Sequence, residues 1–147
     1  MPPDPKIETV LVCDDVRREL SGKDILIGVY SGGIGIPTLP AQMNVAFWIT
    51  LRAPAPGTFT LSLRVNLPQK NPAIDMMTMQ IDISPPPDMP FSDQPIAVFT
   101  PPLPLPITEP GNLELHARWG DSGKWRVALR KPILLVPPST QPTENNP

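Results

Sequence analysis

Apolar and polar residues alternate along two neighbouring stretches near the middle of the chain, MNVAFWITL (43–51) and FTLSLRVNL (59–67). The odd-numbered positions of both stretches carry large apolar side chains. A period of two is the signature of a β-strand with one buried face. Because the linker RAPAPGT contains proline and glycine, we predict that the two strands pair in antiparallel fashion and form one continuous apolar sheet face.

Further stretches with strand character follow this pair. Residues 76–83, MMTMQIDI, alternate in the same way and predict a third strand whose methionines fill core space. Residues 112–130 predict a β-hairpin, because two alternating runs flank the turn sequence GDSG. The second run of this hairpin places Trp125, Val127 and Leu129 together on its apolar face.

The N-terminal part of the chain alternates less clearly. Residues 6–13 are rich in β-branched side chains and predict a strand, whereas VRRELSG (16–22) predicts one helical turn or a short connection. The apolar run DILIGVY (24–30) predicts a strand that is buried on both faces or pairs with the first strand. SGGIGIPTLP (31–40) predicts a structural loop, because a phosphate loop needs a Gly-Lys-Ser/Thr ending and a following helix.

Prolines mark the boundaries between these stretches. The chain contains 24 prolines in 147 residues, about three times the usual share. In PLPLPI (102–107) they instead alternate with leucine and isoleucine. Prolines at every second position can all face away from a sheet partner, so this segment predicts an edge strand or an extended polyproline segment. A PxxP ligand for another protein is the functional alternative, but the interleaved apolar residues favour burial.

Short strands, frequent turn signals and the lack of a long helical pattern predict an all-β protein. The expected architecture is an antiparallel β-sandwich of about eight strands with an Ig-like or C2-like outline, and a closed barrel is the second choice. The length of 147 residues suits a single domain. We expect this domain to span residues 6–137, between a flexible N-terminus (1–5) and a disordered tail (138–147).

Composition and charge narrow the class of partner. The formal net charge is −2, without a long run of either sign, so neither a nucleic acid nor a membrane is an expected partner. The single cysteine, Cys13, cannot form an internal disulfide, and no Cys/His spacing suggests zinc. The N-terminus lacks an apolar signal core, and no run reaches the ~20 residues that cross a bilayer. These features predict a cytoplasmic protein without a cofactor.

Catalytic chemistry finds little support in the sequence. His116 is the only histidine, and its place among the polar positions of a strand predicts an exposed side chain rather than a catalytic base. A thiol dyad of Cys13 and His116 would need the fold to bring them together, and Cys13 is expected to pack as a small hydrophobe. No GxSxG nucleophile motif is present. We therefore expect a protein that is not an enzyme and has no catalytic residues.

Acidic residues in or beside loops raise the possibility of calcium binding. Carboxylates that converge at one end of a sandwich bind Ca²⁺ through their oxygen atoms. Turn formation explains the same positions, because aspartate accepts local backbone hydrogen bonds, and we expect no metal site. The residues concerned are Asp14, Asp15, Asp82, Asp88, Asp93 and Asp121.

Basic residues on the polar side of the last hairpin form the main binding hypothesis. They would dock an acidic protein partner by charge complementarity. The alternative is a solvated strand face whose positive charges protect a sheet edge. The predicted binding residues are Arg118, Lys124, Arg126 and Arg130, with Lys131 beside them.

The chain also resembles a known family. VLVCDDVRREL and GKDILIGVYSGGI near the N-terminus, with GTFTLSLRV and EPGNLELHARW further on, are similar to small uncharacterised bacterial proteins that are also found near phage genes and carry a Cys-Asp-Asp motif. The resemblance covers most of the chain apart from both tails. It implies a compact β-sandwich and supplies no catalytic residue.

These features favour a non-enzymatic module for protein–protein interaction or a structural role. We expect it to act on a protein partner or as a homo-oligomer, through an edge strand or the proline-rich segment. The alternative is a C2-like domain that binds Ca²⁺ or another ligand through the aspartates.

Overall fold

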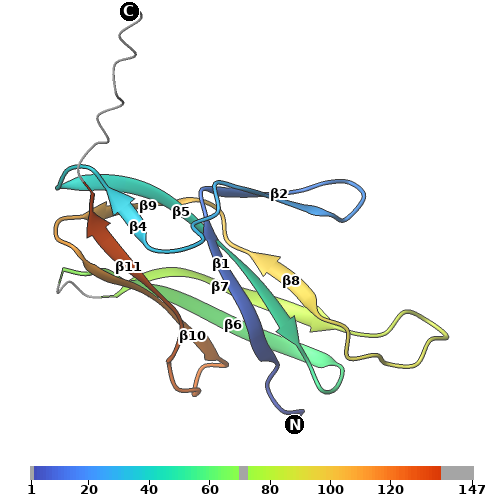
Figure 1. The fold of residues 1–147 in the computed structure, drawn as a ribbon. Helices are drawn as coiled ribbons and strands as arrows, with labels where there is room; N and C mark the ends of the chain where they lie inside the picture. Colours follow the sequence, from blue (N-terminus) through green and yellow to red (C-terminus); the bar gives the residue numbers. More distant parts are fainter. Residues whose placement is uncertain (1, 70–72, 137–147) are drawn as a thin grey trace, which may run out of the picture.

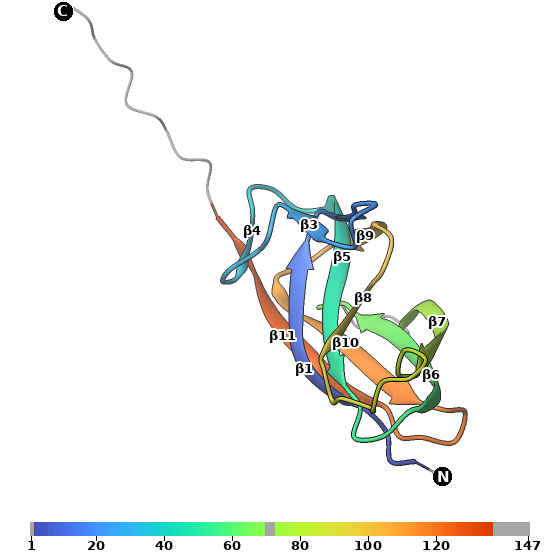
Figure 2. The ribbon, with the colours of Figure 1, turned by 90° about the vertical axis from the view of Figure 1, so that its right-hand side faces the viewer.

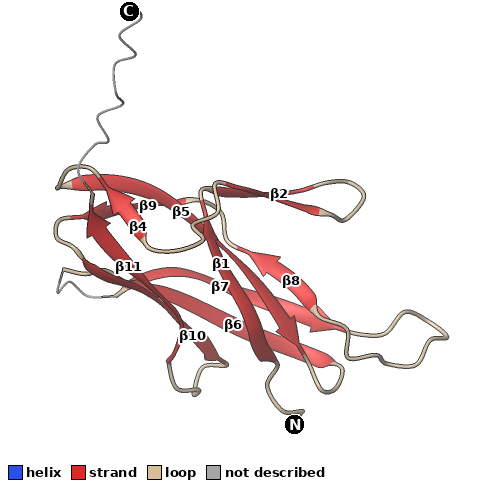
Figure 3. Ribbon diagram, viewed as in Figure 1, coloured by secondary structure: helices blue, strands red, loops and turns tan. Residues whose placement is uncertain are grey.

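The fold consists of β-strands and the loops that join them. The computed structural model describes residues 2–69 and 73–136, and this part of the chain contains strands and no helix (Figure 3). The prediction of an all-β protein is therefore confirmed. Instead of about eight strands, the described residues form eleven: β1 (Lys6–Cys13), β2 (Asp15–Arg18), β3 (Asp24–Ile27), β4 (Ile34–Ile36), β5 (Ala41–Arg52), β6 (Gly57–Asn66), β7 (Ile74–Ile83), β8 (Ile96–Phe99), β9 (Leu103–Ile107), β10 (Gly111–Trp119) and β11 (Arg126–Leu135).

Two sheets enclose one main core (Figures 1 and 2). The smaller sheet has the order β1-β5-β8, and β9 also pairs with β5; the larger sheet has the order β4-β11-β10-β6-β7. Strands of both sheets contribute side chains to the same buried cluster. One pair departs from the expected antiparallel arrangement, because β4 lies parallel to β11. The finer Ig-like or C2-like outline stays a prediction.

The alternating residues of β5 and β6 are buried, as their pattern predicts. Phe47, Ile49 and Leu61 are completely buried, and Leu63 is 1% exposed. The predicted pairing of the two strands is wrong: β5 pairs with β1, β8 and β9, whereas β6 pairs with β10 and β7. Their apolar faces belong to opposite sheets and share one core. The period of a strand determines which side chains are buried, but it does not determine the partner strand.

β2 and β3 form a separate two-stranded hairpin (Figure 1). Residues 16–22 are therefore not a helical turn, because their first part lies in β2. The prediction that residues 24–30 are buried on both faces is also wrong, and within the described residues their pairing with the first strand is limited to one backbone hydrogen bond, from the Tyr30 N–H to the Val12 carbonyl at 2.9 Å. β3 pairs with β2, and its Ile25 and Ile27 are 44% and 41% exposed. The hairpin thus leaves one face in solvent and buries the other.

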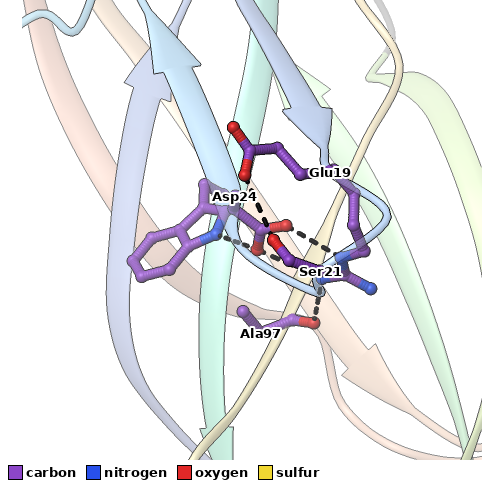
Figure 4. Close-up of polar contacts among 6 residues, drawn as sticks. Glu19, Ser21, Asp24 and Ala97 are labelled. Carbon is purple, nitrogen blue, oxygen red and sulfur yellow. Dashed lines mark hydrogen bonds and ion pairs between the residues drawn. The ribbon is translucent and has the colours of Figure 1, made fainter.

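The buried face of the hairpin is attached to β5 and β8 by polar contacts (Figure 4). The indole Nε1–H of Trp48 donates to Oδ2 of Asp24 at 3.0 Å, and the Arg18 guanidinium donates to both oxygens of the same carboxylate at 2.8 and 3.1 Å. Arg18 also donates to the carbonyl of Ala97 and lies 5.0 Å from the centre of the Phe99 ring. One arginine therefore connects the hairpin to the edge strand β8.

The predicted structural loop at residues 31–40 contains the short strand β4. Ile34 and Ile36 are 1% and 5% exposed within the main core, and β4 pairs with the end of β11. Gly35 separates the two isoleucines. A Cβ at this position would lie 3.0 Å from Cγ2 of Val136, so the glycine allows the close approach of β4 to the end of β11.

The proline-rich strand is confirmed as an edge strand. Leu105 and Ile107 of β9 are completely buried, while Pro104 and Pro106 are exposed, and β9 pairs only with β5 among the described strands. Proline has no N–H, so these two residues can accept but cannot donate backbone hydrogen bonds. The side chain of Gln69 donates to the Pro106 carbonyl at 2.6 Å. This contact occupies one backbone carbonyl on the free edge of β9.

Of the described N-terminal residues, Pro2, Pro3 and Asp4 are exposed, and Pro5 packs against the sheets. Pro5 is buried, and Cγ of Pro2 would lie 3.1 Å from a Cβ at Gly57. The predicted tail of residues 138–147 lies outside the described residues.

Candidate functional site

A cleft opens where the first strand meets the turn of the last hairpin. Its volume of about 490 Å³ is in the range of ligand-binding sites. The beginning of β1, the end of β10 and the beginning of β11 form its walls, together with the turn between β10 and β11. The residues that line it include the apolar Ile7, Ala117, Trp119, Val127 and Ala128 and the charged Asp4, Lys6, Lys124 and Arg126.

Three of the four charged side chains in the cleft are cations, and we call it the basic cleft. Lys6, Lys124 and Arg126 are exposed, and none of them forms an ion pair within the described residues. Asp4 is the single carboxylate that lines it. The basic cleft therefore combines apolar surface with an excess of positive charge, which favours an acidic ligand.

The structure divides the predicted binding residues between two places. Lys124 and Arg126 line the basic cleft. Arg130 lies on the outer face of the larger sheet, where its guanidinium is 2.7 Å from the Glu114 carboxylate. Arg118 lies on that outer face too, and its guanidinium carbon is 4.7 Å from the centre of the Trp125 ring. Two of the predicted residues thus share a site, and the other two contact neighbours on the sheet.

A β-bulge in the last hairpin explains this division. Leu115 of β10 lies opposite Leu129 of β11, but the next residue, His116, lies opposite Val127. Ala128 is therefore an extra residue in β11. Because neighbouring side chains of a strand point to opposite faces, one extra residue changes the face of every side chain beyond it.

The bulge places Arg126 on the side of the basic cleft. Arg126 lies opposite Ala117, which is 5% exposed and belongs to the core, whereas Val127 is 48% exposed. Trp125 contacts arginines on the outer face of the larger sheet. The prediction that Trp125 and Val127 share the apolar face with Leu129 is therefore wrong. A strict alternation counted from the turn does not include the extra residue.

His116 is largely buried on the outer face of the larger sheet. Its side chain is 14% exposed, which differs from the exposed histidine that the sequence predicts. Nε2 lies 3.2 Å from Nδ2 of Asn66 and 3.5 Å from Oε1 of Glu114. The Arg130 guanidinium lowers the pKa of Glu114, and His116 contributes in the same direction. Among the described residues, no hydroxyl or thiol is hydrogen-bonded to this imidazole.

Cys13 packs as a small hydrophobic residue, as predicted. It is completely buried in a small cluster with Val16 and Ala46 beneath the hairpin, and burial raises the pKa of its thiol. Sγ lies 3.6 Å from the Ala46 carbonyl. Cys13 lies beneath the hairpin on the outer side of the smaller sheet, and His116 lies on the outer face of the larger sheet, so the fold does not bring them together as a dyad.

The loop aspartates do not form a metal site in the part of the chain that the structure describes. In residues 2–69 and 73–136, no group of three or more His, Cys, Asp or Glu side chains could hold a metal ion. Asp14 accepts a hydrogen bond from the Tyr30 hydroxyl at 3.3 Å, and Asp15 accepts one from the N–H of Val16 at 2.9 Å. These contacts stabilise local structure.

Sequence reasoning did not identify Lys6 or Trp119 as residues of a binding site. Both line the basic cleft with Arg126. Lys6 begins the first strand and Arg126 begins the last one, so only the packing of the sheets brings them together. In the sequence, Lys6 is only a lysine at the start of a predicted strand, and such lysines are common on protein surfaces.

Comparison of the chain with known protein families identifies one family, and no function is described for it. Residues 8–130 match a family described as a family of unknown function (DUF6941). The search of curated proteins finds no match. In the described residues, no helix has the length and apolar character that a bilayer crossing requires.

Proposed function

The chain belongs to DUF6941, a family of unknown function, and we propose that it is a non-enzymatic protein-interaction module whose basic cleft binds an acidic segment of a partner protein. The observation that carries the proposal is the presence of three cations without ion-pair partners among the described residues, next to apolar surface, in one cleft of about 490 Å³. Positive charge of this kind steers and selects an acidic partner, and the apolar surface contributes affinity.

An extended segment is the partner conformation that the neighbouring strands favour. β11 pairs with β4 only from Ile133 to Leu135, so no described strand pairs with that edge of β11 over residues 126–131. β1 pairs with β5, and no second described strand pairs with it. An extended peptide can form backbone hydrogen bonds with such an edge while its acidic side chains reach the cations of the cleft.

The proline-rich strand β9 is less suitable for adding a strand. Pro104 and Pro106 cannot donate backbone hydrogen bonds, and Gln69 already occupies the carbonyl of Pro106. Self-association through β9 would leave backbone groups of the added strand without partners. This argument favours the basic cleft over the proline-rich segment.

The proposal includes a cytoplasmic location and a bacterial or phage-associated origin. A single free cysteine suits a reducing compartment. The origin rests on the resemblance carried by the Cys-Asp-Asp motif. The absence of enzymatic activity is part of the proposal and is supported by the surroundings of His116, which contacts an amide and a carboxylate.

Binding of an acidic peptide tests the proposal. The probe is a fluorescein-labelled peptide of alternating Glu and Val, measured by fluorescence anisotropy, with a peptide of alternating Lys and Val for comparison. We expect saturable binding of the acidic peptide alone. In R126E and in K124E the affinity should fall at least about tenfold, the equivalent of ~1.4 kcal/mol. K23E is the matched control, because Lys23 is exposed outside the cleft and the substitution changes the net charge equally.

Three results would overturn the proposal. The first is a wild-type protein that does not bind the acidic peptide. The second is an equal loss of affinity in K23E and R126E, which would indicate an effect of net charge alone. The third is a dimer in light scattering that dissociates in R126E, because it would assign the basic cleft to a second copy of the chain.

A further inference from the structure

We infer that the outer face of the larger sheet carries a second binding site, formed by Arg64, Arg118 and Trp125, for a carboxylate attached to a small apolar group. None of these three residues lines the basic cleft. The inference therefore does not depend on the proposed function. Four observations support it: the stacking of the arginines, their missing partners, an adjoining cavity and the local charge.

Trp125 holds two arginines against one aromatic ring. The guanidinium carbons of Arg64 and Arg118 lie 4.2 and 4.7 Å from the ring centre. Arg64 belongs to β6 and Arg118 to the adjacent strand β10, where they lie opposite His116 and Ser62 respectively. The two arginines are therefore diagonal neighbours on one face of the sheet. Cation–π attraction offsets part of the repulsion between their charges.

Both arginines lack an ion-pair partner within the described residues, although Arg64 lies opposite Asp75 in the ladder of β6 and β7. Neither Arg64 nor Arg118 takes part in an ion pair there. The Nε atoms of both are buried and have no hydrogen-bond partner among the described residues. Buried polar groups in folded proteins are nearly always hydrogen-bonded, and neighbouring like charges are unfavourable without a counter-charge. An anion that bonds to the guanidinium groups would relieve the charge repulsion.

A cavity of about 210 Å³ lies beside the arginine pair. Arg118 and Trp125 line it together with Met76 and Met77 of β7. Both methionines pack against the main core, so the Trp125 ring supplies the apolar surface on the outer face. The cavity therefore offers space for an apolar group of a few carbon atoms next to a carboxylate that Arg118 can bind.

The polar groups of the cavity favour a ligand with a single negative charge. The hydroxyl groups of Ser62 and Thr78 are 3.1 Å apart and share one hydrogen bond, so one hydroxyl hydrogen remains for a ligand. Asp75 and Arg118 are the charged residues of the lining, and Arg64 lies next to the cavity on the Trp125 ring. The three together carry one positive charge, which a monocarboxylate neutralises and a phosphate dianion would exceed.

A pair of small probes tests this site. N-acetylleucine has a carboxylate and an apolar side chain, and N-acetylleucinamide is the same molecule without the negative charge. The measurement is the indole N–H signal of Trp125 in ¹⁵N-labelled protein, and the other two tryptophans, Trp48 and Trp119, serve as internal controls. We expect a saturable shift of the Trp125 signal with the acid and at least a tenfold weaker response to the amide, while Trp48 does not respond.

Substitutions identify the arginine that binds the carboxylate. We expect R118Q to weaken the binding of N-acetylleucine at least tenfold and R118K to weaken it less, because lysine keeps the charge but loses the forked geometry. R130Q is the matched control, because Arg130 lies on the same outer face and is paired with Glu114. Unchanged Trp48 signals in each variant show that the fold is intact.

The inference is overturned if the acid and the amide shift Trp125 equally, or if R118Q binds the acid as the parent protein does. It is also overturned if no Trp125 shift reaches saturation. Displacement of N-acetylleucine by the alternating Glu and Val peptide would also overturn the inference, because the two sites would then not be separate. Failure of the peptide to bind, with intact binding of N-acetylleucine, would remove the proposed function alone.

Discussion

Trp48 donates its indole N–H to the Asp24 carboxylate at 3.0 Å, and this hydrogen bond joins the central strand β5 to the hairpin that covers its outer face. The neighbouring residue Phe47 is completely buried on the opposite face of the same strand. β5 is therefore covered on both sides, by the main core and by the hairpin. This explains why Ala46 and Trp48 interrupt the polar positions of an otherwise alternating strand.

Loss of the Asp24 charge should loosen the hairpin. We expect D24N to lower the free energy of unfolding by about 1–2 kcal/mol near neutral pH, because it removes charge-assisted hydrogen bonds from Arg18 and Trp48. The expected loss of unfolding free energy is no larger because the Arg18 side chain is 46% exposed and its ion pair with Asp24 is screened by solvent. Urea denaturation measures the change, and D82N at an exposed aspartate is the control.

The effect of D24N should depend on pH. Arg18, and then Trp48, lower the pKa of Asp24 from its usual value of 3.8. Because folding lowers this pKa, the charged carboxylate stabilises the folded state above pH 3.8, and the contribution is lost as the pH falls through the lower, folded pKa. The difference in stability between the parent and D24N should therefore be constant above about pH 5 and shrink below 3.8. A difference that grows in acid would contradict this account.

Where the chain leaves β8, the Thr100 side-chain hydroxyl accepts the hydrogen bond from the Phe47 N–H that a backbone carbonyl accepts in a regular sheet. The Thr100 N–H donates to the Phe47 carbonyl and its Oγ1 accepts from the Phe47 N–H, both at 3.0 Å, and Thr100 is 1% exposed. T100V leaves a buried N–H without an acceptor, so we expect a loss of about 1–3 kcal/mol in the free energy of unfolding. T100S keeps the hydroxyl and loses only a methyl group, about 0.8 kcal/mol. Equal losses in the two variants would show that the hydroxyl is not required.

Gly28 and Gly22 should respond differently to substitution by alanine. Both have positive φ, +69° and +88°, which alanine adopts at a cost of about 1–2 kcal/mol. A Cβ at Gly22 meets no atom within 4 Å, whereas one at Gly28 would lie 2.7 Å from Cγ of Asp14 and displace the carboxylate that Tyr30 contacts. We expect G28A to be less stable than G22A by about 1 kcal/mol. Thermal denaturation of both variants checks the difference, and equal stabilities would contradict it.

The burial pattern of the central strands could be predicted because it is local. Phe47, Leu63 and Leu105 are buried as their alternation indicates. The edge position of β9 was also predictable, because Pro104 and Pro106 allow no other role in a sheet. In each case the information lies within a few neighbouring residues.

The basic cleft and the arginine pair were less predictable. Arg126 reaches the cleft because Ala128 is an extra residue in β11, and nothing in the sequence around Ala128 indicates a bulge. Arg64 and Arg118 are separated in the sequence by β7, β8 and β9, and they meet because β6 pairs with β10. Strand partners and bulges depend on contacts between distant residues, so a pattern of polar and apolar positions does not determine them.

The amino-acid sequence by itself determined the all-β class and the faces on which the central apolar side chains lie, because the two-residue period of a strand and the conformational limits of proline act over short distances. Only the tertiary structure decided that β5 and β6 lie in opposite sheets and that Lys6 joins Arg126 in one cleft. These arrangements bury apolar surface from the whole chain. They therefore depend on how all the strands pack together and not on any single segment.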